Sequence, residues 1–180
     1  MTAIVPAKRP QISLSEVAQV AERYGKGQAI LLGYRGYYKT MGDPAKNDRG
    51  IYDDAIALYC PSRCVAFNAN VDPQGFRKGI AVLQPGVYSY KIGIHGITKP
   101  PEKRYEALVQ AAPVTILRDG ASATETGFFG LNIHRGSYGS VSSVGCQTLY
   151  PSQWDEFIFT VKAQMKALSQ DRISYVLREE

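Results

Sequence analysis

Residues 130–147 read GLNIHRGSYGSVSSVGCQ, and our interpretation of the whole chain starts from this segment. It opens with the alternation of apolar and polar residues typical of a strand, which includes His134. Glycine and serine follow, and the pair Gly145-Cys146 stands near the end of the segment. The thiolate is the nucleophilic form of cysteine, so we expect His134 to act as the base that holds Cys146 as a thiolate. The alternative is that Cys146 is a small buried apolar residue, which is the commoner role of a free cysteine.

The composition predicts one domain made mainly of strands. A chain of 180 residues is long enough for one well-packed core and short for two. Its 12 tyrosines, 17 glycines and 10 prolines favour many short strands and turns over a helical bundle. We therefore expect an α+β, mainly β domain over residues 1–180, built from twisted sheets or a partly closed β-sandwich or barrel.

Periodic apolar residues predict helices at both ends of the chain. A capping box at Ser13 precedes an apolar stripe, which predicts a helix over residues 14–24. A similar box at Ser152 predicts a long C-terminal amphipathic helix that continues to residue 169. The prolines that open residues 100–112 allow a shorter helix there.

Strands are expected in the remaining apolar runs. We predict two strands on either side of a Pro-Gly turn within residues 80–97, and a polar loop over residues 121–127. The other expected strands lie in residues 29–38, 51–60, 64–71, 113–120 and 172–179.

Charge and cysteine usage exclude several classes of protein. The net charge of +5 is mild and the basic residues are scattered, so we do not expect a nucleic-acid partner. No apolar run is long enough for a transmembrane segment. Cys60 and Cys64 flank Pro-Ser-Arg, and we interpret both as structural, because a metal site would need two further ligands nearby. We expect no metal and no cofactor.

Three segments resemble the L,D-transpeptidase catalytic domain of the YkuD type. They are LQPGVY at residues 83–88, NIHRG at 132–136 and SVGC at 143–146, in the order that the family shows. The resemblance covers about residues 80–165 and implies a helix shortly after the cysteine. The chain departs from the family pattern at Arg135, which is inserted after the histidine, and at Val144, where a second histidine is common.

The resemblance implies an enzyme that acts on peptidoglycan stem peptides through an acyl-enzyme. Cys146 would attack an amide carbonyl beside a diaminopimelate centre, and His134 would accept the thiol proton. The acyl group would pass to an amine or to water, which gives transpeptidase, carboxypeptidase or endopeptidase activity. Oxyanion and substrate binding would fall to four neighbouring residues, Gly145, Ser143, Arg135 and Gly136.

Two alternatives remain open. A second histidine, His95, lies in a more literal copy of the family's histidine element, IGIHG at residues 92–96. We favour His134 as the base, because a short loop can hold it against Cys146, and we expect His95 to be a buried strand residue or a pocket wall. The whole protein could also be a binding or structural module of a phage or a secreted protein, with the β-rich fold but no turnover.

The N-terminal sequence lacks the charged and then apolar pattern of a signal peptide. We therefore expect synthesis in the cytoplasm, with action at the cell wall or in the periplasm after lysis or dedicated export.

Overall fold

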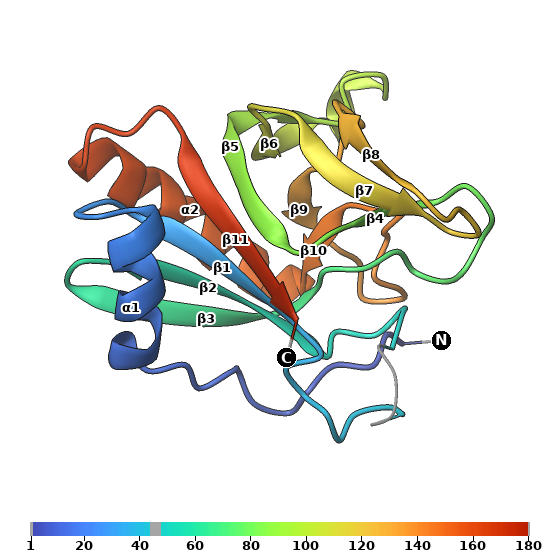
Figure 1. Ribbon diagram of the computed structural model, residues 1–180, viewed down its shortest axis with the longest axis horizontal. Coiled ribbons are helices and arrows are strands. Elements are labelled where there is room, and N and C mark those ends of the chain that lie inside the picture. Colours follow the sequence, from blue (N-terminus) through green and yellow to red (C-terminus); the bar gives the residue numbers. More distant parts are fainter. Residues whose placement is uncertain (1, 44–47, 180) are drawn as a thin grey trace.

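The computed structural model describes residues 2–43 and 48–179 (Figure 1). The fold is α+β and mainly β, as the composition predicted. The described helices are α1 (Leu14–Tyr24), the 3₁₀ helix η1 (Pro101–Lys103) and α2 (Pro151–Ala167). The described strands are β1 (Ile30–Arg35), β2 (Asp54–Cys60), β3 (Arg63–Asn70), β4 (Ala81–Leu83), β5 (Gly86–His95), β6 (Tyr105–Gln110), β7 (Val114–Arg118), β8 (Thr124–Gly127), β9 (Ile133–Arg135), β10 (Gln147–Leu149) and β11 (Ile173–Glu179).

Strands from both halves of the chain close into one barrel. The hydrogen-bonded order among the described strands is β1-β11-β5-β6-β9-β10-β3-β2, and β2 pairs back with β1. The final strand β11 lies parallel to β1, with Leu32 opposite Val176. Strands β9 and β10 are also parallel, and His134 lies opposite Thr148. The barrel thus brings residues 130–149 beside the β5–β6 hairpin.

Helix α1 covers the outside of the barrel, as its apolar stripe predicted. Ser13 is its N-cap, and the Ser13 hydroxyl accepts a hydrogen bond from the backbone N–H of Glu16. Val17 and Ala21 are buried, and they pack in one cluster with residues such as Ile30 on β1. Figure 1 shows α1 across β1, β2 and β3, at the end of the molecule away from β7 and β8.

Helix α2 packs against the opposite face of these strands. Leu31 belongs to the main core cluster together with Trp154, Phe157 and Val161 of α2. The rings of Phe67 on β3 and Phe157 lie 5.3 Å apart in an edge-to-face contact. Successive side chains of β1 and β2 point in turn toward α1 and toward the core that contains α2. Both faces of these strands are therefore buried, which explains why they are apolar on both sides.

A smaller sheet, β4-β7-β8, lies beside the barrel. Its strand β8 falls in residues 121–127, where the sequence predicted a polar loop, so that prediction was wrong. The prediction missed β8 because its side chains are mostly exposed and carry no apolar alternation. They are held by cross-strand contacts to β7, such as the one between the hydroxyls of Thr115 and Thr126 at 2.9 Å.

Two helix predictions also need correction. The helix expected over residues 100–112 is only the three-residue η1, and most of the remaining segment, Tyr105–Gln110, is strand β6, which pairs with β5. Helix α2 begins at Pro151, and its N-cap position is Tyr150, which makes no side-chain cap. Ser152 lies inside the helix and therefore does not cap α2. Proline suits the first helical position, because it has no N–H that a cap would need to satisfy.

Candidate functional site

A cavity of about 290 Å³ opens where β9 and the loop before β10 meet the β5–β6 hairpin. It contains both members of the predicted nucleophile and base pair, and two of the four predicted binding residues, Arg135 and Gly136. The other two, Ser143 and Gly145, are buried and do not line it. Its lining residues are His95, Lys99, Tyr105, His134, Arg135, Gly136, Ser142, Val144 and Cys146.

The backbone fixes the orientation of the His134 imidazole. Its Nδ1 lies 2.8 Å from the carbonyl oxygen of Arg135 and 3.2 Å from the hydroxyl of Tyr105. A carbonyl oxygen can only accept a hydrogen bond, so Nδ1 carries the hydrogen in the neutral ring. The lone pair is therefore on Nε2, which is the tautomer that a general base needs.

The Cys146 thiol is held by backbone groups of the segment that precedes β9. The N–H of Asn132 donates to Sγ at 3.4 Å, and Sγ donates to the carbonyl oxygen of Gly130 at 3.5 Å. Burial raises the pKa of the Cys146 thiol above its ordinary value, although the Asn132 hydrogen bond opposes the shift. The resting thiol is therefore protonated at neutral pH.

His134 is neutral as well. Burial lowers the pKa of its imidazole from 6.5 to about 4, and the positive charges of His95 and Lys99 act in the same direction. A neutral histidine and a neutral thiol make a general-base pair. Burial therefore disfavours the charged forms of both groups in the resting site, the thiolate of Cys146 and the imidazolium of His134.

The second histidine belongs to the same cavity. The rings of His95 and His134 stack with their centroids 3.9 Å apart and their planes 22° apart. The side-chain amide of Asn132 lies 3.2 Å from Nδ1 of His95, so the residue whose N–H contacts the thiol also orients this ring. His95 is half-buried, which confirms the expectation of a pocket wall.

The loop before Cys146 uses its own polar groups for support. The Ser143 hydroxyl donates to the carbonyl oxygen of Cys146 at 2.6 Å and accepts from the N–H of Gly145 at 3.1 Å. The N–H of Gly136 donates to the carbonyl oxygen of Leu149. The N–H groups of Gly145 and Gly136 are thus engaged, and the N–H of Cys146 makes no hydrogen bond to another described residue.

Glycine at position 145 is required by close packing. Its φ of +120° is disfavoured for other residues, and a Cβ there would lie 2.6 Å from the carbonyl oxygen of Ala81. The loop therefore packs against β4 of the small sheet, which places Cys146 at the junction of the two sheets.

The sequence did not identify three residues of the site, Tyr105, Lys99 and Asn132. Tyr105 was hidden by the wrong helix prediction, and it faces His95 across the β5–β6 pair. Lys99 lies in the turn between these strands, where a single lysine has no distinctive signal. Asn132 stood in the quoted segment, but only the fold shows that it contacts both the thiol and His95.

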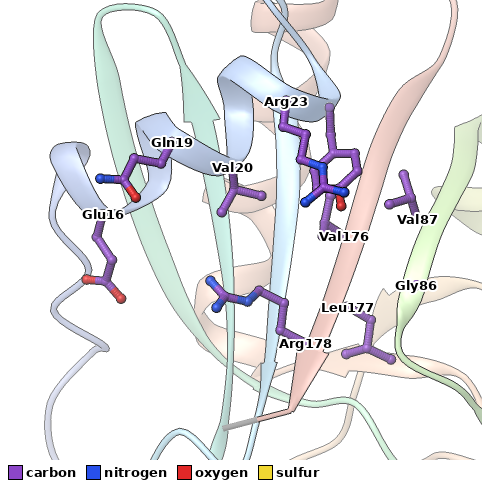
Figure 2. A pocket seen from close by; sticks show the side chains of 10 residues that line it. Glu16, Gln19, Val20, Arg23, Gly86, Val87, Val176, Leu177 and Arg178 are labelled. Atoms are coloured by element: carbon purple, nitrogen blue, oxygen red, sulfur yellow. The ribbon is translucent and has the colours of Figure 1, made fainter.

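A larger groove lies elsewhere, between α1 and strands β5 and β11 (Figure 2). Its volume is about 860 Å³, and its walls include Val20, Arg23, Val87 and Arg178. Volume alone favours this groove as a binding site. Its lining holds no cysteine and no histidine, so it offers no nucleophile and base pair, and we place the candidate site at Cys146.

The comparisons with known proteins identify no relative: no family model, no curated protein and no solved structure matches this chain. Within residues 2–43 and 48–179, no group of three His, Cys, Asp or Glu residues could hold a metal ion. No helix in the described part of the chain is long and apolar enough to cross a membrane.

Proposed function

We propose that this protein is a cysteine-dependent acyl-transfer enzyme, similar to the L,D-transpeptidases, which acts on peptidoglycan stem peptides. The observation that carries the proposal is the arrangement around His134. Its Nδ1 is fixed by the Arg135 carbonyl, and the ring lines one small cavity with Cys146. This leaves Nε2 as a proton acceptor in a cavity that also contains a cysteine.

The proposed reaction begins with both groups neutral. As Sγ of Cys146 bonds to the substrate carbonyl carbon, Nε2 of His134 accepts the thiol proton. The N–H of Cys146 donates to the oxygen that becomes negative. When the C–N bond breaks, the His134 proton passes to the leaving amine and a thioester remains. A second amine, or water, then attacks the thioester and restores the thiol.

The substrate class comes from the family resemblance of residues 83–88, 132–136 and 143–146. The same resemblance implies action at the cell wall or in the periplasm, which the protein would reach after lysis or through dedicated export. Transpeptidation and hydrolysis differ only in the molecule that attacks the thioester, so the same site serves both.

Purified murein provides the test. We expect the parent protein to change the muropeptide profile and Cys146→Ala to leave it unchanged. Cys64→Ala is the matched control, because Cys64 is partly exposed on β3 and lines no part of the cavity. A profile altered equally by the parent protein and by Cys146→Ala would contradict the assignment of the nucleophile.

A binding module is the second candidate, and the protonated state of the thiol favours it. A thiol whose pKa is raised by burial is also what a structural cysteine shows. In this case murein would keep its profile with every variant, while the protein would still sediment with the polymer. That combination would favour binding without turnover.

A further inference from the structure

The cavity at Cys146 carries positive charge and no compensating carboxylate. Lys99 and Arg135 lie at its lining, and none of its lining residues is Asp or Glu. Neither cation forms an ion pair with a carboxylate in the part of the chain that the structure describes. Since both histidines lose their charge at neutral pH, the two cations dominate the cavity's electrostatics.

Hydrogen bonds fix the backbone of Lys99, and an aromatic ring contacts the guanidinium of Arg135. The N–H of Lys99 donates to the carbonyl oxygen of Gly96 at 2.7 Å, and Nε of Arg104 donates to the Lys99 carbonyl oxygen at 2.6 Å. The Arg135 guanidinium lies over the Tyr105 ring, 5.1 Å from its centroid. The turn after β5 and the end of β9 thus present one cation each to the same cavity.

We infer that this cavity selects ligands that carry a carboxylate, and that Lys99 is the residue that determines this selectivity. Burial is the main influence on the pKa values of Cys146, His95 and His134, and the positive charge of Lys99 adds a smaller lowering at all three, so its field reaches each of these groups. A negative charge beside the scissile amide would therefore be attracted to the place where the chemistry occurs.

For the substrate, this inference rests on the proposed function: the acyl donor carries a free carboxylate next to the amide that is cleaved. An amidated donor would bind more weakly, because the cations would then be desolvated without a partner. The selectivity itself is a property of the cavity and can be measured without peptidoglycan.

Two alkylating reagents of nearly equal size test the inference. Iodoacetate is an anion and iodoacetamide is neutral, and in both reactions Sγ bonds to the CH₂ carbon as the C–I bond breaks, iodide leaves and the thiol proton passes to a base, Nε2 of His134 or water. We measure the rates at Cys146 for both reagents by peptide mass spectrometry, on the full chain at low salt. The ratio of the iodoacetate rate to the iodoacetamide rate should fall about fivefold in Lys99→Met, the change expected for one nearby charge in water.

Lys91→Met is the matched control, because Lys91 is exposed on the same strand as His95 but lies outside the cavity. Its ratio should equal that of the parent. Cys64 serves as an internal reference for folding, since its rates should not differ among the three proteins. Added salt at about 0.5 M should reduce the parent's preference, because screening shortens the range of the Lys99 field.

An equal ratio in the parent and in Lys99→Met would overturn the inference. So would a Cys146 that neither reagent modifies, because a ligand could not then reach the cavity. Unchanged muropeptides together with the expected ratio would reject the peptidoglycan substrate alone and leave the carboxylate-selective cavity in place.

Discussion

At the scale of single residues, burial determines the protonation state of His134. The residue is 5% exposed, and burial makes the protonated imidazole costly, although the hydrogen bond from Nδ1 to the Arg135 carbonyl partly offsets this cost. This cost has a consequence for stability. Between pH 6.5 and pH 4 the unfolded chain binds a proton at this histidine that the folded chain does not bind, so lower pH favours unfolding.

We predict that urea unfolding at several pH values will detect the proton that His134 binds on unfolding. Between pH 7 and pH 4.5 the parent should lose about 2.5 kcal/mol more free energy of unfolding than His134→Gln, which cannot titrate. Asp53 and Asp54 have pKa values raised by burial and act in the opposite direction, but both proteins retain them. Equal losses in the two proteins would mean that His134 titrates normally in the folded state.

At the scale of elements, the two helices begin in different ways despite similar sequence motifs. Ser13 and Ser152 each precede an apolar stripe, and each has an acidic residue three positions later. The Ser13 hydroxyl caps α1, whereas α2 begins with Pro151 and has no side-chain cap. The sequence predicted a serine cap for each helix, and only the Ser13 cap forms, because α2 begins one residue before Ser152, at Pro151.

Alanine substitution distinguishes the capping serine, Ser13, from Ser152, which caps no helix. Ser13→Ala should lower the free energy of unfolding by about 1 kcal/mol, because the N–H of Glu16 loses its partner. Ser152→Ala should change it by less than about 0.5 kcal/mol, as expected for a surface position without a cap. Chemical denaturation measures both values, and equal effects of the two substitutions would contradict the assigned helix starts.

The fold and part of the site could be predicted from local patterns. The helix over residues 14–24 and most of the strands follow from apolar periodicity, which is a local property. Strand β8 was missed because its exposed side chains carry no apolar alternation, and strand β6 because its place in the barrel depends on pairing with β5 and β9. The cavity required the same long-range information: His95, Lys99 and Tyr105 reach Cys146 only through the pairing of β5, β6 and β9.

At the scale of the whole molecule, β11 completes the barrel between β1 and β5. Tyr175 on this strand is fully buried, and its ring contacts that of Tyr90 with centroids 5.8 Å apart. Its hydroxyl has no hydrogen-bond partner among the described residues. The Tyr175 hydroxyl lies against the backbone of Gly33, where it occupies the space that a side chain at position 33 would fill.

Removal of the Tyr175 hydroxyl should not lower the free energy of unfolding. We predict that Tyr175→Phe leaves the free energy of unfolding unchanged or raises it by up to about 1 kcal/mol, because a buried polar group without a partner is lost. Tyr88→Phe is the control: its hydroxyl donates to the Gln84 carbonyl oxygen at 2.6 Å, and its loss should cost about 1 kcal/mol. Thermal unfolding of the pair measures the difference, and a larger loss at Tyr175 would refute the packing described.

In the reaction that we propose, Cys146 forms a thioester with a peptidoglycan stem peptide. The most direct measurement is acid quenching of the parent protein shortly after mixing with purified muropeptides, followed by mass spectrometry of the cysteine-containing peptides. We expect an added acyl mass on the Cys146 peptide, none on the Cys60 or Cys64 peptides, and none anywhere in Cys146→Ala. Muropeptide turnover without any acyl mass on Cys146 would contradict the claim.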